Sequence, residues 1–192
     1  MKFGKLLKFF LVFGCHVLLA CTIKREGKIF LEVFMGVIGR TQDGAVVVDR
    51  ANSHLHECAR KFIGEAVSKV KVNGRAFIEA EVDFGRVIGS SICVQTDQGD
   101  DIVFAQRPNR KGLTRFVVGR DPEPTSKFMV VLKATDDPQK YVLITAFLGS
   151  KAQPEPWDPR ATVESIKFWQ NRALVWGSEY VVDGTKTTEC PW

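Results

Sequence analysis

The chain has 192 residues, of which 45% are hydrophobic and 26% are charged, and its formal net charge is +5. A disordered chain would carry fewer apolar residues and a larger charge imbalance, so that class is excluded. Collagen-like and coiled-coil arrays are also excluded, because glycine follows no three-residue period and no heptad pattern persists. The length suits one domain of ordinary size.

The first 21 residues have the order of a secretory signal. Three lysines come first, an apolar run follows over residues 9–20, and small residues form a cleavage site. Residues 18–21 (LLAC) are also similar to a bacterial lipobox, in which Cys21 would carry the lipid. We expect export or membrane anchoring if this segment is a signal. The alternative is an N-terminal helix packed on the domain of a cytoplasmic protein.

Most of the positive charge belongs to that segment, since the rest of the chain has 24 basic and 22 acidic residues. The three cysteines outside it are an odd number without CxxC spacing, so neither a disulfide framework nor a zinc knuckle is indicated. The alternative is a single disulfide bond that includes Cys190. We expect no cofactor.

Hydropathy patterning predicts the elements of the first half in chain order. Residues 28–38 are an apolar helix or strand, residues 41–44 a turn, and residues 45–48 a short strand. Apolar residues at helical spacing predict a helix over residues 53–72, capped by Asn52 or Ser53. Asn73 and Gly74 end it.

From residue 76 the apolar period is close to two, which predicts a series of strands joined by short turns. These strands cover residues 76–84, 86–96, 102–106, 113–119, 128–134 and 141–148. The first of them is alternatively a continuation of the helix. Short turns between neighbouring strands imply an antiparallel meander.

After a Pro-rich loop, Asp158 and Pro159 are the expected N-cap and first residue of a final helix that runs to Trp176. Residues 179–183 are an expected edge strand. The fold class predicted is α+β: N-terminal helices packed on a twisted antiparallel β-sheet, with a C-terminal helix. Residues 22–185 form this single domain, and residues 186–192 are a loose tail.

Residues 106–120 contain five basic side chains and no acidic one, in a predicted hairpin. Arginine offers a planar fork that matches phosphate oxygens, and lysine adds a point charge. Gly112 is expected to take a positive φ in the hairpin turn. The alternative is a solvated turn that resists edge-to-edge pairing. The basic residues are Arg107, Arg110, Lys111, Arg115 and Arg120.

Two of the three histidines, His54 and His56, lie at the start of the predicted helix. A histidine can give or take a proton near neutral pH, so either is a candidate acid or base. The alternative is a half-buried structural His56 and a surface His54. Thr145 lies on an apolar strand, where it either favours β structure or donates a hydrogen bond to phosphate. No metal site is predicted, because no HExxH or CxxC accompanies the histidines.

The order of these pieces resembles the barnase–EndoU–colicin–RelE-like nuclease superfamily, especially its phage- and polymorphic-toxin-associated branch. Four segments carry the resemblance, and together they span about half of the chain. The resemblance implies helices on an antiparallel sheet, RNA cleavage without a metal, and a protein partner of immunity or antitoxin type. The chain departs from the family in its N-terminal segment and its Pro/Trp-rich C-terminal extension. The four segments are residues 53–57 (SHLHE), 101–105 (DIVFA), 110–117 (RKGLTRFV) and 143–149 (LITAFLG).

The expected function is therefore a metal-independent endoribonuclease acting on RNA or another phosphate-bearing substrate. RNA can be cut by attack of its own 2′-hydroxyl on the adjacent phosphate, which requires a base, an acid and cations. His56 or His54 would be the acid or base, Arg115 and Lys111 would hold the phosphate, and Thr145 would orient an oxygen. The alternative is a non-enzymatic α+β domain that binds an anion or a partner, with or without a membrane anchor. The expected substrate-binding residues are Arg107, Arg110, Thr114 and Arg120.

Overall fold

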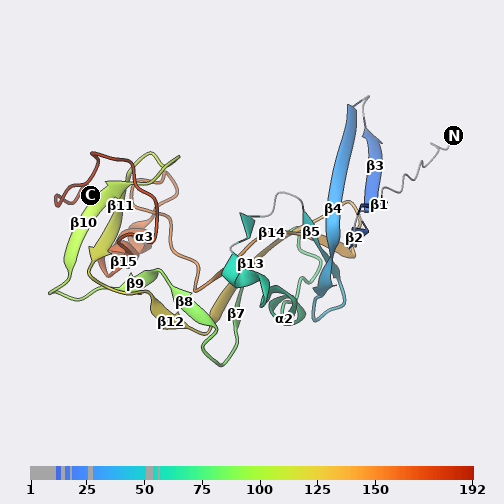
Figure 1. Ribbon diagram of the computed structural model, residues 1–192, viewed down its shortest axis with the longest axis horizontal. Helices are drawn as coiled ribbons and strands as arrows, with labels where there is room; N and C mark the ends of the chain where they lie inside the picture. The colour runs from blue at the N-terminus through green and yellow to red at the C-terminus, as the bar shows by residue number, and fades with distance from the viewer. Residues whose placement is uncertain (1–11, 14–15, 18, 26–27, 51–53, 56) are drawn as a thin grey trace. The chain divides into compact units, whose positions relative to one another are not determined.

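The computed structural model describes the chain except for residues 1–11, 14–15, 18, 26–27, 51–53 and 56 (Figure 1). Side chains are described over residues 36–49 and from residue 58 onward. The fold is mixed α/β, and strands predominate over helices. The chain divides into two compact units, whereas a single domain was expected over residues 22–185. Unit 1 comprises residues 1–82 and 128–147, and unit 2 comprises residues 83–127 and 148–192.

Unit 1 is built on one sheet whose strands are antiparallel at one edge and parallel further in. Strand β5 pairs antiparallel with β4 and parallel with β14, so the predicted meander is wrong here. The run Phe128 to Leu132 is buried, as expected for a strand covered on both faces. The strands, in spatial order, are β3 (Leu19–Arg25), β4 (Lys28–Arg40), β5 (Val46–Arg50), β14 (Lys140–Leu148), β13 (Lys127–Ala134) and β7 (Phe77–Asp83).

The N-terminal segment lies largely outside the described residues. Its described part forms a two-stranded sheet of β1 (Val12–Phe13) and β2 (His16–Val17), followed by the start of β3. Within the part of the chain that is described, no helix has both the length and the hydropathy to cross a membrane. The signal and lipobox predictions stay predictions.

The predicted helix over residues 53–72 is wrong in its first turn and too long. Strand β6 (His54–Leu55) pairs in parallel with β14, and the helical part is split into α1 (Glu57–Arg60) and α2 (Ile63–Ser68). Strand β5 pairs with β14 over residues 140–142, and β6 pairs with the next part of the same strand at residues 145–146. The β6 backbone therefore hydrogen-bonds to a sheet instead of to a helix. The expected caps, Asn52 and Ser53, lie outside the described residues.

The turn over residues 41–44 is confirmed, and Asp43 ties it to the end of the helical segment. Its carboxylate accepts hydrogen bonds from the backbone N–H of Asn73 (2.8 Å) and Val72 (2.9 Å), and from the Thr41 hydroxyl (2.7 Å). These bonds, that from Asn73 first, lower the pKa of Asp43 to about 2. One acidic side chain thus fixes the β4–β5 hairpin against the chain that follows α2.

Unit 2 contains a four-stranded sheet with β11 and β15 at its centre. The β10–β11 hairpin is antiparallel as predicted, but β15 pairs in parallel with β11. The strand predicted over residues 86–96 is broken at Ile92, because β8 (Gly89–Ser91) pairs with β12 (Glu123–Thr125) in a second sheet. The strands of the larger sheet, in spatial order, are β10 (Asp101–Gln106), β11 (Leu113–Val118), β15 (Arg172–Val175) and β9 (Cys93–Gln95).

The predicted final helix is too long at both ends, since α3 covers Val163–Gln170. Its N-cap is Thr162, whose hydroxyl accepts a hydrogen bond from the Ser165 N–H, while the Ser165 hydroxyl accepts one from the Thr162 N–H. Asp158 instead accepts from the backbone N–H of Arg160 (2.9 Å) in the preceding loop. After α3 the chain forms β15, because the apolar residues that follow fill both faces of the sheet.

The C-terminal residues lie along β10, although residues 186–192 were expected to be loose. Thr187 exchanges backbone hydrogen bonds with Phe104, and the Phe104 and Trp192 rings meet edge to face at 5.0 Å. Residues 179–183 do not form the expected strand, although the Val182 N–H donates to the Gln106 carbonyl. These contacts cover the free edge of the sheet.

Candidate functional site

Arg107, an expected substrate-binding residue, is committed to a buried network inside unit 2. It pairs with Glu155, and its Nε donates to the hydroxyl of Thr114 (3.1 Å), which in turn donates to Glu155. Trp157 Nε1 also donates to Glu155 (3.1 Å). Thr114 is fully buried. This network fixes the loop after β14 on the β10–β11 hairpin, and it engages the guanidinium of Arg107, which is partly buried.

Arg115 and Arg120 are also held by protein groups. Arg115 Nη1 donates to the hydroxyl of Thr96 and to the carbonyl of Arg172, both at 2.9 Å. Arg120 contacts both carboxylate oxygens of Asp100 at 3.0 Å and pairs with Glu123 at 3.3 Å. Residues 106–120 contain no acid, but groups from other strands and loops hold these two arginines.

The hairpin tip carries the remaining two basic side chains, Arg110 and Lys111, which are exposed. Gly112 does not take the expected positive φ; Asn109 does, at 61°. A Cβ at Gly112 would instead lie 2.2 Å from the Trp157 ring. Glycine is required here so that the backbone can pack against an indole, which brings Trp157 and Glu155 to the hairpin.

The expected acid–base residues belong to unit 1, whereas the basic hairpin belongs to unit 2. His54 and Thr145 are register partners in the parallel pairing of β6 with β14, so their backbones lie side by side. The His54 side chain and the whole of His56 lie outside the described part of the chain. Thr145 is half-buried.

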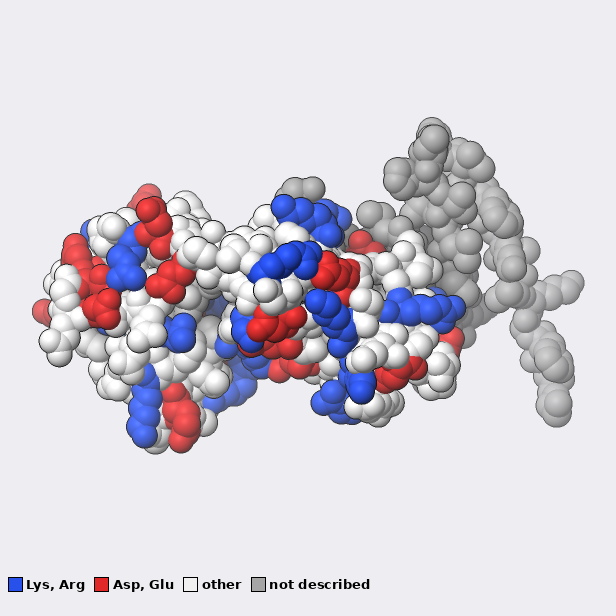
Figure 2. Space-filling view, turned by 90° about the horizontal axis from the view of Figure 1, so that it is seen from below, with Lys and Arg blue, Asp and Glu red and all other residues white. Residues whose placement is uncertain are grey.

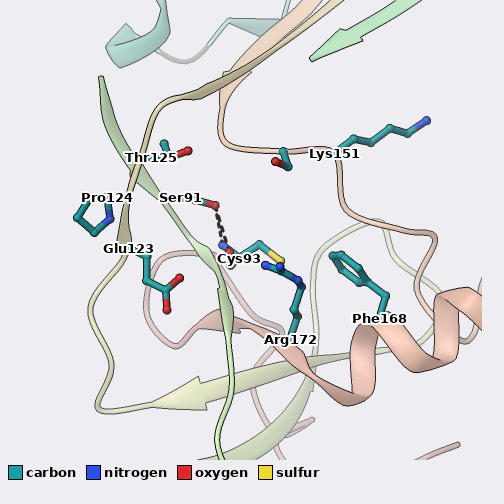
Figure 3. A pocket seen from close by; sticks show the side chains of 9 residues that line it. Ser91, Cys93, Glu123, Pro124, Thr125, Lys151, Phe168 and Arg172 are labelled. Atoms are coloured by element: carbon teal, nitrogen blue, oxygen red, sulfur yellow. Dashed lines mark hydrogen bonds between the residues drawn. The ribbon is translucent and has the colours of Figure 1, made fainter. Parts of the chain in front are cut away.

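A pocket of about 180 Å³ lies within unit 2, and residues from five elements and the loop after β14 line it (Figure 3). Three hydroxyls, from Ser91, Thr125 and Ser150, contribute to its wall. Ser91 is fixed in place, because its hydroxyl donates to the Cys93 carbonyl (3.2 Å) and accepts from the Cys93 N–H (3.3 Å). Pro124 and the ring of Phe168 add apolar surface. The site is thus small and polar on one side.

The guanidinium of Arg172, at the start of β15, is one of the charged groups that line this pocket, with Lys151 and Glu123. Its Cζ lies 5.3 Å from the centroid of the Phe168 ring, which supports it from one side. Figure 3 shows the Arg172 side chain ending beside Cys93, whereas Lys151 extends away from both. Among the described residues, no carboxylate pairs with Arg172. A cation that shares a pocket with hydroxyls and lacks an acidic partner is a site for an anion.

The Cys93 thiol in the same pocket is not a nucleophile at neutral pH. Burial raises its pKa to about 11, Arg172 lowers it to a smaller degree, and Glu123 raises it. Since the thiolate is the reactive form, the thiol stays protonated and adds only a weak donor to the wall. The pocket therefore has the character of a binding site more than of a thiol-based catalytic site.

Gly149 allows the chain to reach the pocket after β14. Its φ is +98°, and a Cβ there would lie 2.8 Å from the Ser91 hydroxyl. The sequence reasoning missed this site because it continued the final helix through Arg172. Asn171, which caps α3, was the available signal, since asparagine is favoured where helices end.

Charges of both signs are interspersed on the face shown in Figure 2, with no large field of one sign. Within the described residues, no three His, Cys, Asp or Glu side chains gather in a way that could hold a metal ion. Within the described part of the chain, the unit 2 pocket is the candidate site. Comparison with protein-family models, with curated proteins and with solved structures found no match.

Proposed function

We propose that the protein is a binding module that holds the anionic group of a small ligand in the unit 2 pocket through Arg172. The observation that carries the proposal is an arginine that contacts Phe168, shares a pocket with hydroxyl-bearing residues and has no acidic partner in the described part of the chain. A guanidinium matches the two oxygens of a carboxylate or phosphate, and such charge-assisted pairs are the stronger hydrogen bonds. This is the anion-binding alternative expected from the sequence, at a different place in the chain.

The size of the pocket favours a small ligand over a nucleic acid. Its volume of about 180 Å³ lies below the roughly 300–1,000 Å³ of sites for drug-sized molecules. The arginines that would otherwise follow a phosphate backbone are already paired: Arg107 with Glu155, and Arg120 with Asp100. The charge that supports binding is therefore concentrated at Arg172.

The test is a titration of the full chain with acetate and with inorganic phosphate at constant ionic strength, followed by NMR. We expect saturable binding of at least one anion, weakened about tenfold or more by Arg172→Gln, which removes a charge-assisted contact. Arg110→Gln is the matched control, because it removes an exposed arginine of the same unit outside the pocket. The proposal fails if neither anion binds, or if both variants behave alike.

The second candidate is the metal-independent ribonuclease, favoured by the register that pairs His54 with Thr145. The superfamily resemblance and the RNA substrate stay predictions. Full-length protein is incubated with RNA in excess EDTA and compared with His54→Ala, His56→Ala and Arg115→Ala. Circular dichroism of each variant separates lost activity from lost folding. This candidate requires cleavage by the wild type and its loss in the folded variants; no cleavage, or equal cleavage by all four proteins, contradicts it.

A further inference from the structure

Two side chains of opposite charge line the unit 2 pocket without pairing with each other. Glu123 comes from β12 and Arg172 from β15. Both residues are described, and no ion pair joins them. The partner of Glu123 is Arg120, at 3.3 Å, which does not line the pocket. A positive and a negative group thus border one cavity, and a ligand of suitable length can contact both.

Glu123 restricts the kinds of anionic ligand that the unit 2 pocket can hold. A phosphate dianion bound to Arg172 would place two negative charges in a small cavity that Glu123 also borders, and like charges at short range repel. A ligand with one carboxylate and one ammonium group meets a partner on each side. Charge complementarity of this kind determines specificity more than it determines total affinity.

We infer that the ligand is a small zwitterion of amino-acid type, whose carboxylate binds Arg172 and whose ammonium group binds Glu123. The inference rests on the proposed function and names the chemistry of its ligand. A cavity of about 180 Å³ accommodates a molecule of few heavy atoms. The hydroxyl of Thr125 accepts a hydrogen bond from the Lys127 N–H (3.1 Å), so its own proton is available to a ligand oxygen.

Lys151 does not change this assignment. Its side chain extends away from Arg172 and Cys93 in Figure 3. Cys93 adds no charge, because its thiol is protonated. Arg172 and Glu123 are therefore the charged groups on which recognition depends.

The experiment compares matched probes on the full chain by NMR titration at neutral pH and constant ionic strength. Glycine is compared with acetate and methylammonium, β-alanine with propionate and ethylammonium, and inorganic phosphate is titrated separately. We expect at least one zwitterion to bind at least several-fold more tightly than the matched carboxylate and the matched amine. Each matched probe lacks one of the two charges, so the comparison isolates the contribution of each side of the pocket.

Two variants then test which pocket residue contacts each charged group of the ligand. Glu123→Gln should reduce the affinity for the zwitterion to that for the matched carboxylate without weakening carboxylate binding, and Arg172→Gln should weaken both. Asp121→Asn, two residues from Glu123 and exposed, is the control for a general loss of negative charge. Amide spectra of the free variants report whether each one folds.

The outcomes separate this inference from the proposed function. If acetate or phosphate binds as tightly as every zwitterion, and only Arg172→Gln weakens it, the zwitterion inference is wrong and anion binding stands. If Glu123→Gln and Asp121→Asn affect zwitterion binding equally, the role of Glu123 is wrong. If no probe binds the wild type, the proposed function fails together with the inference.

Discussion

At the scale of single residues, the structure assigns Gly112 a packing role in place of a conformational one. A glycine in a hairpin turn suggests a positive φ, but here the neighbouring Asn109 supplies it. Gly112 instead lets the backbone lie against Trp157. Such a close approach depends on a side chain 45 residues further along the chain, so local sequence carries no signal for it.

Gly112→Ala should therefore destabilise the protein. Its new Cβ would lie 2.2 Å from Trp157 Cγ, and overpacking of this kind costs about 1–3 kcal/mol. Gly99→Ala is the matched control, since no atom lies within 4 Å of a Cβ built there and its φ is ordinary. Urea unfolding of both variants checks the prediction. Equal midpoints for the two variants would show that the indole moves aside without penalty.

Asp43 is expected to make stability depend on acid pH. Its pKa is lowered from 3.8 to about 2 by hydrogen bonds that the folded state provides. The stabilisation is therefore present above about pH 4 and is lost as the pH falls through the folded pKa. Asp43→Asn should remove it, so the difference in unfolding midpoint between wild type and variant should shrink between pH 4 and pH 2. A difference that stays constant across this window would contradict the assignment.

At the scale of elements, strands could be predicted where apolar and polar residues alternate or where apolar residues form a continuous run. Elements whose conformation depends on pairing with a strand distant in sequence could not be predicted. The β10–β11 hairpin and the buried run of β13 agree with their sequence patterns. Strand β6 differs, because Leu55 begins the apolar helical stripe in the sequence, but in the fold His54 and Leu55 pair with β14 beyond the end of β5. The final helix was likewise predicted to include the residues of strand β15. A short apolar run such as RALV fits the period of a helix and that of a strand equally well.

The candidate site could be predicted less well than the fold. The sequence window that holds Arg107, Arg115 and Arg120 contains no acid. The acidic partners of Arg107 and Arg120, among them Glu155 and Asp100, come from elsewhere in unit 2, and Arg115 is held by uncharged groups. Arg172 was missed because its neighbours in the pocket lie on strands that only the folded chain brings together. The charged window in the sequence and the proposed pocket therefore belong to the same unit, but they involve different side chains.

The Glu155 network is the element-scale contact that holds residues 149–157 on the hairpin. Glu155→Gln should destabilise the protein by about 3 kcal/mol, because Arg107 loses a buried charged partner. The double variant Arg107→Met with Glu155→Leu should lose less than the sum of its single variants, since it removes both charges of the buried pair, and Glu179, the second partner of Arg107, is partly exposed. Chemical denaturation of the three proteins measures the coupling. Strictly additive losses would show that the pair does not act as a unit.

At the scale of the whole molecule, net charge is a poor guide to function. Most of the excess positive charge lies in the first 21 residues, and the remainder is near balance. The visible surface mixes both signs (Figure 2). A nearly neutral body does not attract polyanions strongly over long range. The function is therefore expected to depend on one small pocket in unit 2 more than on the overall electrostatic field of the protein.

The most direct test of that claim is the map of amide shifts in the NMR titration of the full chain with a carboxylate ligand. We predict that the shifted amides cluster around the pocket, at Ser91, Cys93, Lys151 and Arg172, and that Arg172→Gln abolishes the pattern. Shifts confined to the hairpin tip at Arg110 and Lys111, or a pattern unchanged in Arg172→Gln, would contradict the claim that the pocket is the binding site.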